Sequence, residues 1–550
     1  MKKTIIIILS IIFLPLVIVI LISTCLYLSA DMQQPEININ QADYVTEQRG
    51  DTLFCKDSYL YQNEYKLWEL NVQGSSAEKG AKIGALAKDL LKYQEDVFIK
   101  QIREIIPSDS YLNLLRYMTI IFNRNIAENI DLEYREEIAA ISEFCTEEYN
   151  AIGTPYERQL NYHAAHDIGH AMQQYMLVGC SSFGVWGNRS STGELLIARN
   201  FDFYVGDDFA KNRTITFSTP DKGYKYVSIS WAGMMGVLSG INEQGLTVTI
   251  NAAKGAVPTS SATPISILAR EILQYASTIE EAYEIASTKT TFVSESILIG
   301  SRKDNSAAII EKTPKEIALF SVDGEEIIST NHYQSAQLGT TEVNIENIKN
   351  SDSKYRYDRV TELLQQDSTL DYKKAIDILR NRYGKNGKDV GIGNEMTPNQ
   401  SIAHHSVVFA TTSNKMWVST ANWQSGTMLC YDLDGFFKNG DKPRAVQEYT
   451  VDADSTFIKE DLPRLLAYRD GVKAIQKANW KGQEVEEDVL ESFLTQNPNN
   501  YYTYRLLGDY YLEHKQKDKA IEYYTLALSK EIPYNSERIE ISKIIEDEKR

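Results

Sequence analysis

The residue of this chain best placed to do covalent chemistry is Cys180, because of the residues that come after it. An apolar and aromatic run begins at the cysteine, breaks in a polar turn at 188–193, and resumes before Arg199 and Asp202. Two short apolar runs around a polar turn predict a β-hairpin. The open ends of a hairpin lie side by side, so the thiol can meet a guanidinium and a carboxylate across the strand pair. These neighbours make Cys180 a candidate nucleophile.

Two asparagines could complete such a site. Asn251 and Asn331 each follow a run of β-forming residues, so each amide can stand at a strand end facing a cleft. Acyl transfer passes through a tetrahedral oxyanion, and a fixed donor to that charge is worth roughly 3–4 kcal/mol. From the residues alone, other roles stay open. The asparagines can cap backbone groups, Asp202 can simply pair with Arg199, and Cys180 can be a small buried hydrophobic residue.

The motifs after Cys180 occur in the order typical of a known superfamily. They are RNFD at 199–202, GINEQGL at 240–246, TNH at 330–332 and SKYRYDR at 353–359. With these motifs, residues from about 70 to 430 resemble the N-terminal-nucleophile (Ntn) hydrolases of the choloylglycine hydrolase, penicillin V acylase and acid ceramidase superfamily. The embedded Gly-Cys pair looks most like peptidase family C45, the acyl-CoA:6-aminopenicillanic-acid acyltransferase-like family.

The resemblance implies a precursor that cuts itself between Gly179 and Cys180, and a mature enzyme whose nucleophile is the new terminal cysteine. It implies no cofactor and no metal, and it assigns catalytic roles to Arg199, Asp202, Asn251, Asn331 and Arg356. Cleavage would free an α-amino group with a pKa of about 7.7–8.0, low enough to act as base toward the thiol. Arg359 shares a helical face with Arg356, so the choice between these arginines stays open.

Histidines invite further assignments. His332 stands next to a candidate oxyanion residue, but the α-amine is the base in the family pattern, so we expect a structural or substrate-contacting role. His163, His166 and His170 fall on one face of a predicted helix and could mimic a metal triad. The resemblance offers no metal, and histidines on one face also pack or bond to neighbours, so both interpretations stay open. Residues 404–405 are interpreted as polar strand-end histidines.

Composition excludes some classes of partner. The chain has 550 residues, 43% of them hydrophobic, which gives ample core for two or more domains. Its formal net charge of −18 argues against binding to nucleic acid or to an anionic membrane surface. Five cysteines show no zinc or disulfide spacing, although Cys55 and Cys145 could form a bridge outside the cytoplasm.

The first 30 residues predict a transmembrane signal anchor. Two lysines precede an uncharged run over 4–28, which is longer than a secretory core and long enough to span a bilayer. By the positive-inside rule the lysines stay cytoplasmic. The rest of the chain is therefore expected to be membrane-anchored and extracytoplasmic, in a bacterial cell envelope. Lipidation of Cys25 is the alternative.

The remaining chain divides into four predicted segments. Residues 31–70 are polar and mixed, which predicts a linker, and residues 71–179 show helical spacing and would stay attached after self-cleavage. Residues 180–463 form the predicted catalytic domain, where strands dominate. This order suits an α+β fold, an αββα sandwich of two antiparallel sheets covered by helices on both faces. Residues 464–550 are predicted to be all-α.

The C-terminal residues resemble a tetratricopeptide repeat. The diagnostic positions are YRLLGDYY at 504–511, then Ala520, Tyr524, Ala527 and Pro533. Residues 489–498 predict the second helix of a preceding partial repeat, and residues 535–549 predict a capping helix. An ordinary helical hairpin packed on the catalytic domain is the alternative. A protein partner could bind either one.

The leading hypothesis from the sequence is a self-processing cysteine Ntn amidohydrolase or acyltransferase. Cys180 would attack a non-peptide N-acyl amide bond in a small substrate, form a thioester, and pass the acyl group to water or an amine. The substrate stays open, because relatives handle N-acyl amino acids, N-acylethanolamines, bile conjugates and β-lactam side chains. The alternative is a catalytically inactive Ntn-fold binding or scaffold protein that uses its tetratricopeptide-like tail.

Overall fold

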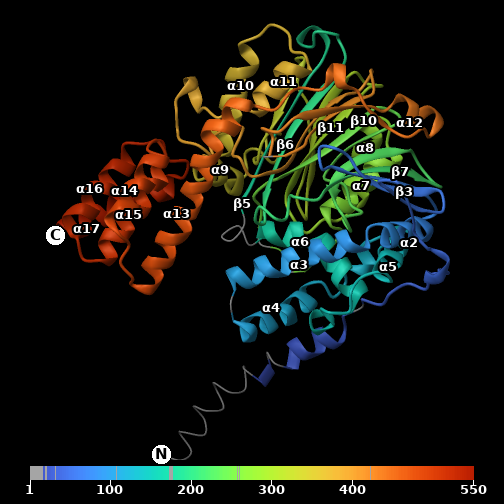
Figure 1. Cartoon of the computed structure of the whole chain (residues 1–550), viewed down its shortest axis with the longest axis horizontal. Coiled ribbons are helices and arrows are strands. Elements are labelled where there is room, and N and C mark those ends of the chain that lie inside the picture. Colours follow the sequence, from blue (N-terminus) through green and yellow to red (C-terminus); the bar gives the residue numbers. More distant parts are fainter. Residues whose placement is uncertain are drawn as a thin grey trace, which may run out of the picture.

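A computed structural model describes residues 17–18, 21–30, 32–106, 108–171, 177–256, 258, 260–421 and 423–550. Two stacked β-sheets lie between layers of helices, and a further group of helices extends from one side of this body (Figure 1). This is the α+β class and the layer order that the sequence predicts, with an all-α C-terminal region.

The smaller sheet holds Cys180. Its strand order is β14-β5-β6-β15-β16-β17-β18, and neighbouring strands are antiparallel. Strands β5 and β6 form the predicted hairpin, with Cys180 opposite Phe201. The strands are β5 (Leu177–Val185), β6 (Leu196–Tyr204), β14 (Glu326–Ser329), β15 (Ala403–Ala410), β16 (Lys415–Ser419), β17 (Met428–Asp432) and β18 (Arg444–Ala445).

Helices α10 (Ser353–Gln365) and α11 (Tyr372–Leu379) cover the outer face of the smaller sheet. Phe183 of β5 and Ala198 of β6 pack against apolar residues of both helices. Successive residues of a strand point to opposite faces. Ile197 accordingly belongs to the core between the sheets, and so each residue of β6 has a defined side.

The larger sheet has the order β1-β2-β3-β4-β7-β8-β9-β10-β11-β12-β13. Its first strands come from the segment predicted as a linker, so that prediction is wrong. Strands β1 to β3 are short and mostly exposed or half-buried, and β4 joins the sheet through a parallel, non-local pairing with β7. The strands are β1 (Glu47–Arg49), β2 (Thr52–Cys55), β3 (Ser58–Gln62), β4 (Trp68–Gly74), β7 (Arg213–Pro220), β8 (Tyr226–Trp231), β9 (Ser239–Asn242), β10 (Leu246–Ala252), β11 (Glu295–Ser301), β12 (Ser306–Lys312) and β13 (Ile317–Phe320).

Helices before and after Cys180 in sequence pack on the outer face of the larger sheet in one shared apolar core. Helix α2 crosses α5 closely, because a Cβ on Gly80 would lie 2.3 Å from the Glu137 carbonyl oxygen. The buried Glu137 carboxylate binds Lys79 at 3.1 Å and Arg270 of α7 at 2.9 Å. This ion triad ties the pre-cysteine helices to the later chain. The helices are α2 (Ser76–Leu86), α3 (Lys88–Ile105), α4 (Asp109–Phe122), α5 (Leu132–Ser142), α6 (Pro155–Ala171), α7 (Ile265–Tyr275) and α8 (Ile279–Thr288).

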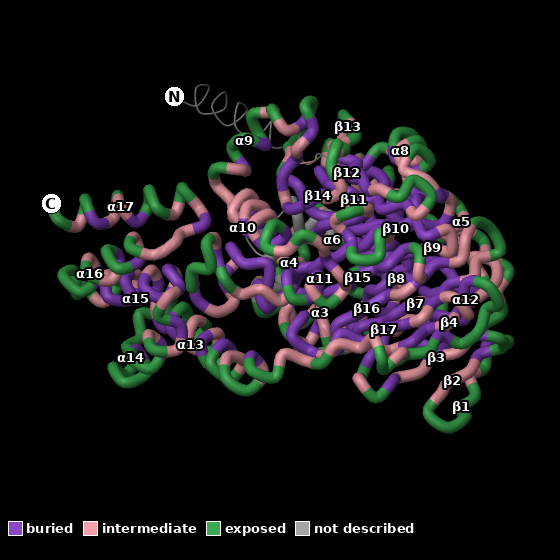
Figure 2. Tube along the Cα trace, turned by 90° about the horizontal axis from the view of Figure 1, so that it is seen from above, coloured by how far each residue is buried: buried purple, intermediate pink, exposed green. Residues whose placement is uncertain are grey.

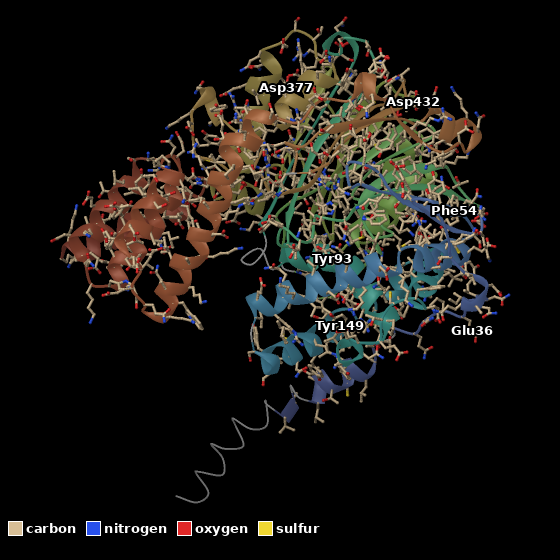
Figure 3. The ribbon with its side chains drawn as sticks, viewed as in Figure 1. Glu36, Phe54, Tyr93, Tyr149, Asp377 and Asp432 are labelled. Atoms are coloured by element: carbon tan, nitrogen blue, oxygen red, sulfur yellow. The ribbon has the colours of Figure 1, made fainter. Side chains whose placement is uncertain are left out.

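Most strands of the two sheets, apart from β1 to β3 and β18, form the buried centre of the molecule (Figure 2). Apolar side chains such as Phe217 fill the space between the sheets. Figure 3 shows Asp377 of α11 and Asp432 of β17 on the side of the molecule opposite to Tyr93 of α3 and Tyr149. The two helical layers therefore lie on opposite sides of the sandwich.

The C-terminal helices have a core of their own, rich in tyrosine. Helix α13 begins at Leu462, so the predicted boundary at 463 falls in its first turn. Gly508 of α15 allows close approach of α16, since a Cβ there would lie 2.7 Å from the Tyr524 ring. The predicted hairpin and its flanking helices are present, whereas their identity as a tetratricopeptide repeat stays a prediction. The helices are α13 (Leu462–Lys481), α14 (Glu487–Gln496), α15 (Tyr501–Glu513), α16 (Lys517–Leu528) and α17 (Asn535–Lys549), and two short helices of the body are α9 (Glu342–Lys349) and α12 (Asp434–Asn439).

Two other expectations concern the N-terminus and the cysteines. Within the described part of the chain, no helix has the length and apolar character needed to cross a bilayer. Most of the predicted anchor at 4–28 lies outside the described residues. All five cysteines are described and each is free, so the bridge considered between Cys55 and Cys145 is not formed.

Candidate active site

The peptide bond between Gly179 and Cys180 lies within strand β5 and not, as the sequence suggests, at the end of a helical segment. Cys180 is opposite Phe201 of β6, and Gly179 is opposite Asp202. Because directly opposite residues of an antiparallel pair share a face, Cys180 lies on the face toward the larger sheet. Asp202 lies on the other face, which α10 covers. The expected trio is thus split across the two faces of one hairpin.

The face toward the larger sheet holds the thiol and a buried arginine. Arg199 Nη2 lies 3.7 Å from Cys180 Sγ, and the side chain is fully buried. Nη1 donates to the Leu238 carbonyl oxygen at 2.5 Å and to Ser239 Oγ at 2.6 Å, while Nη2 also donates to the Ile250 carbonyl oxygen. Backbone groups of the larger sheet therefore fix the cation beside the sulfur.

Burial raises the pKa of the Cys180 thiol above its ordinary value, although the Arg199 cation opposes this rise. The carboxylates of Asp202 and Glu295 add to it. The thiol is therefore the favoured form of Cys180 in the uncut chain, despite the neighbouring Arg199 cation. Glu295 begins β11 and is fully buried, and no local sequence signal marks it as part of the site.

The backbone nitrogen of Cys180 is bonded at the edge of β5 that faces β14. Strand β14 stops pairing with β5 at Ser182, so the next polar partner along the edge is a side chain. Cys180 N donates to Asn331 Oδ1 at 2.9 Å, and Arg356 Nη2 donates to the same oxygen at 2.7 Å. Arg356 Nη1 also donates to the Cys180 carbonyl oxygen at 2.6 Å. These contacts fix both the nitrogen and the carbonyl oxygen of the cysteine backbone.

Asp202 is fully buried opposite Gly179, next to the bond that self-cleavage would break. Within the described residues neither of its carboxyl oxygens has a hydrogen-bond partner. Burial raises the pKa of Asp202 well above its ordinary value, against the opposing effect of Arg356 and Arg199. Burial thus favours the neutral form of this carboxyl group in the uncut chain, and the group lies where a new amine would need a partner.

The structure separates the two candidate arginines. Arg356 contacts the cysteine backbone, whereas Arg359 donates to Glu362 and Asn381, away from it. Asn251 of β10 is close to the site on the other face, where it accepts from Ser182 Oγ at 3.0 Å. In the uncut chain the amide nitrogens of both candidate oxyanion residues are engaged. Asn251 Nδ2 donates to the Ser329 carbonyl oxygen at 3.0 Å, and that of Asn331 to the Ala252 carbonyl oxygen at 2.8 Å.

The histidines lie around the site and not at the sulfur. His332 shares hydrogen bonds with Thr330 and Ser353, and burial lowers its pKa to about 4. His163 accepts from Met235 N at 3.1 Å. The side chains of His166 and His170 lie outside the described residues, and no cluster of metal-binding side chains occurs in the part of the chain that the structure does describe.

His405 is a residue whose place the sequence did not reveal. It lies near the start of β15, as expected of a strand-end histidine, but it is fully buried. Its Nε2 is 2.8 Å from Ser239 Oγ, the hydroxyl that accepts from Arg199. Burial lowers the pKa of His405 well below its ordinary value, so a neutral imidazole supports the hydroxyl that holds the arginine.

A cavity whose lining includes several aromatic side chains lies beside the pre-cysteine part of β5. Phe203, which lines it, is opposite Val178 and points to the same face as Cys180. Helices α3 and α6 close its other side with residues such as Phe98 and Tyr162. The cysteine is not itself part of the lining. The cavity continues the thiol face of β6 in the direction of the pre-cysteine residues.

Comparison with known proteins gives one family match. Residues 188–423 match the model described as acyl-coenzyme A:6-aminopenicillanic acid acyl-transferase. The match begins after Cys180. It includes the other five candidate residues, Arg199, Asp202, Asn251, Asn331 and Arg356.

Two curated proteins are similar in sequence. An uncharacterized protein of Archaeoglobus fulgidus is 23% identical over 363 residues, covering 59% of this chain and 60% of that protein. Protein dcd1B of Dictyostelium discoideum is 22% identical over 267 residues, covering 46% of this chain and 51% of that protein. The chain thus spans between half and three fifths of the length of these relatives.

Solved structures also match parts of the chain. The Caenorhabditis elegans ortholog of N-acylethanolamine-hydrolyzing acid amidase is 17% identical with a TM-score of 0.30, covering 42% of this chain and 93% of that one. A mutant of conjugated bile acid hydrolase from Clostridium perfringens is 12% identical with a TM-score of 0.34, covering 49% of this chain and 96% of that one.

Proposed function

We propose that this chain, whose residues 188–423 match the acyl-coenzyme A:6-aminopenicillanic acid acyl-transferase model, is a self-processing cysteine enzyme of the Ntn amide hydrolase or acyltransferase kind. Cys180 would act on non-peptide N-acyl amide bonds through a thioester. The observation that carries the proposal is the buried Arg199 cation 3.7 Å from the Cys180 sulfur, with Asp202 across the strand from Gly179.

Self-processing would begin with attack of Cys180 Sγ on the carbonyl carbon of Gly179. The C–S bond forms, the C–N bond between the two residues breaks, and the nitrogen takes the thiol proton. Water then opens the thioester and returns the thiol, leaving a carboxylate on Gly179. The contacts of Asn331 and Arg356 support this step, because they hold the leaving nitrogen and its residue in place.

Cleavage would change the electrostatics of the site. The freed α-amine has an ordinary pKa of about 7.7–8.0 and can take the proton of the neighbouring thiol. A new ammonium beside Asp202 would favour the carboxylate, reversing the effect of burial on that pKa. Asn331 Oδ1, which accepts from the peptide nitrogen in the uncut chain, can accept from the amine. Nucleophile and base would then belong to one residue.

Turnover needs donors for the oxyanion of the substrate. We propose that Asn251 and Asn331 supply them once the chain is cut, because each side chain stands at one side of Cys180. Their amide nitrogens donate to backbone carbonyl oxygens in the uncut chain, so both side chains must reorient after cleavage to donate to the substrate. A fixed donor of this kind is worth roughly 3–4 kcal/mol in the transition state.

The proposed substrate is a small N-acyl amide with a bulky apolar acyl group. The aromatic cavity supports this, since Phe203, Phe209 and Trp231 line it on the thiol face of β6. Strand residues before Cys180 lie alongside Phe203 in the uncut chain. Cleavage would free that side of the cysteine, so the acyl group would have a path from the cavity to the sulfur.

The setting of the enzyme is also a proposal. The uncharged run at 4–28 supports anchoring in a membrane with the body outside the cytoplasm. The C-terminal helices could bind a protein partner in addition to the small substrate. A catalytically inactive binding protein on the same fold is not favoured, because Arg199, Asn331 and Arg356 all contact Cys180.

The test uses the full-length protein purified in detergent. Intact mass and N-terminal sequencing should show a chain that begins at Cys180, and a panel of N-acyl substrates with detection of the released amine should show turnover. Active protein that remains one uncut chain would contradict the α-amine mechanism. Cut protein that releases no amine from any member of the panel would favour the binding alternative.

A further inference from the structure

A long buried segment without helix or strand lies beside the cleavage bond. It covers residues 388–402, between α11 and β15, and we call it the 388–402 segment. Irregular backbone in a protein interior needs side-chain partners for its polar groups. Asn200 of β6 supplies one, donating to the Pro398 carbonyl oxygen at 2.8 Å, and it also donates to the carbonyl oxygen of Leu379 at the end of α11 at 2.8 Å. Asn399 adds another by accepting from Ser401 N at 3.0 Å.

This fixed segment brings Gln400 to the bond that self-cleavage would break. Gln400 Nε2 lies 3.5 Å from the Gly179 carbonyl oxygen, and the side chain is 3% exposed. A Cβ built on Gly179 would lie 2.7 Å from that nitrogen and 3.1 Å from Gln400 Oε1. The amide of Gln400 thus occupies the space that any side chain at position 179 would need. A glycine before the cysteine is required for this contact.

We propose that Gln400 is a catalytic residue of self-cleavage, donating from Nε2 to the Gly179 oxygen as it becomes an oxyanion. This inference rests on the proposed self-processing. When Cys180 Sγ bonds to the Gly179 carbon, the carbonyl π electrons move to that oxygen, and they return as the C–N bond breaks and the nitrogen takes the thiol proton. Catalytic hydrogen bonds that are long in a resting site tighten as charge develops, so the 3.5 Å between Nε2 and the oxygen is a fitting starting distance.

Gln400 is distinct from the residues assigned to the thiol and the nitrogen. Arg356 donates to the Cys180 carbonyl oxygen, which does not react, and Arg199 donates toward the sulfur. Neither Asn251 nor Asn331 donates to Gly179 in the uncut chain. Within the described residues, Gln400 is the side chain that donates a hydrogen bond to the scissile carbonyl.

The C-terminal helices hold the segment in place. Arg469 of α13 donates from Nη2 to the Ser401 carbonyl oxygen at 2.7 Å, directly after Gln400. Its guanidinium lies 4.7 Å from the centre of the Trp423 ring. Asn497 bonds to both the backbone nitrogen and the carbonyl oxygen of Ile392 at 3.0 Å. Arg469 is therefore a positioning residue, and the helical region contributes to the chemistry of the sandwich.

The experiment measures the rate of self-cleavage of the full chain. Pulse-labelled cell-free synthesis in detergent, followed by intact mass over time, gives that rate for each variant. Gln400→Ala and the isosteric Gln400→Glu, which lacks the N–H donor, should both slow cleavage about 100-fold. The exposed Gln447→Ala is the matched control and should cleave at the wild-type rate. Cleavage of either Gln400 variant at the wild-type rate would overturn the proposal.

A steric test distinguishes hydrogen-bond donation by Gln400 from a role in filling space. Gly179→Ala should block cleavage by displacing the Gln400 amide. The double variant Gly179→Ala, Gln400→Gly relieves the clash but still lacks the Gln400 amide donor. It should therefore cleave no faster than Gln400→Ala. A double variant that recovers the wild-type rate would show that Gln400 only fills space, and would overturn the proposal.

The positioning role of Arg469 predicts a dependence on Gln400. Arg469→Met should slow cleavage about 10-fold, Arg469→Lys should restore most of the rate, and Arg469→Met should add nothing in a Gln400→Ala chain. An undiminished effect in that background would assign Arg469 to the fold alone. If the wild-type chain never cuts itself, the proposed function fails. If it cuts and the Gln400 variants match it, only this inference fails.

Discussion

The two faces of strand β6 present different side chains to the surroundings of Cys180. On one face Arg199 and Phe203 look toward the larger sheet, where the sulfur and the aromatic cavity lie. On the other face Asn200 and Asp202 look toward α10 and the 388–402 segment, where the cleavage bond is held. One strand can therefore present side chains to the nucleophile on one face and to the cleavage bond on the other, because successive side chains point to opposite faces.

The largest effect should come from removing the nucleophile that both faces serve. Cys180→Ala should abolish self-cleavage and turnover, because no other group can form the thioester. Cys180→Ser should still cut slowly, since a hydroxyl can attack the preceding carbonyl but is the poorer nucleophile here. Intact mass and amine release measure the two activities. Turnover by Cys180→Ala would remove the basis of the comparison between the faces.

The candidate oxyanion residues should come next. Asn251→Ala and Asn331→Ala should fold and lower kcat by about 100-fold or more, if each supplies a donor to the substrate oxyanion. Asn439→Ala, at an exposed site, is the control. A wild-type kcat in either variant would return that asparagine to a structural role, the role shown by its bonds in the uncut chain.

Asp202 tests the second face alone. Asp202→Asn should lower kcat about 10-fold, because a hydrogen bond to a charged amine is worth roughly 1.5 kcal/mol or more. It should slow self-cleavage less, since both carboxyl oxygens of Asp202 lack hydrogen-bond partners within the described uncut chain. Comparing the time course of cleavage with kcat of the cut protein measures the split. Equal losses in both would contradict the division of labour.

The smallest effect should be on the free energy of unfolding. It concerns Glu395 in the 388–402 segment, which lies between the second face of β6 and the C-terminal helices. Burial raises the pKa of Glu395 in the 388–402 segment to about 7, and the Asp352 and Glu537 charges contribute. A carboxyl group with a raised folded-state pKa stabilises fully below its unfolded pKa, and this contribution is lost as pH rises through about 7. Arg356 opposes the shift, and Tyr468, Tyr501 and Tyr534 are further titratable neighbours.

Glu395→Gln should therefore raise the free energy of unfolding at pH 8 by at most about 3 kcal/mol, and much less at pH 5. Urea unfolding in a Cys180→Ala background keeps a single chain for the measurement. The exposed Glu448→Gln serves as control. A gain that is equal at the two pH values would show that Glu395 is not held protonated by its surroundings.

The hairpin around Cys180, the helices and the layer order could be predicted from local sequence. Apolar runs broken by a polar turn predicted β5 and β6, and helical spacing predicted the helices within residues 71–179. The polar segment at 31–70 misled, because β4 is stabilised by a parallel pairing with β7 that is distant in sequence. Short edge strands with one solvated face show little of the hydrophobic pattern from which strands are predicted.

By itself the sequence determined which residues could do the chemistry, because thiol, guanidinium and carboxyl groups at hairpin spacing define a nucleophile candidate. Only the tertiary structure decided which face each one serves and which arginine reaches the cysteine, since Arg356 and Arg359 differ by less than one turn. It also brought Gln400 to Gly179 through an irregular segment held by distant helices. Local periodicity has no access to such contacts, because they depend on burial and on pairings between remote parts of the chain.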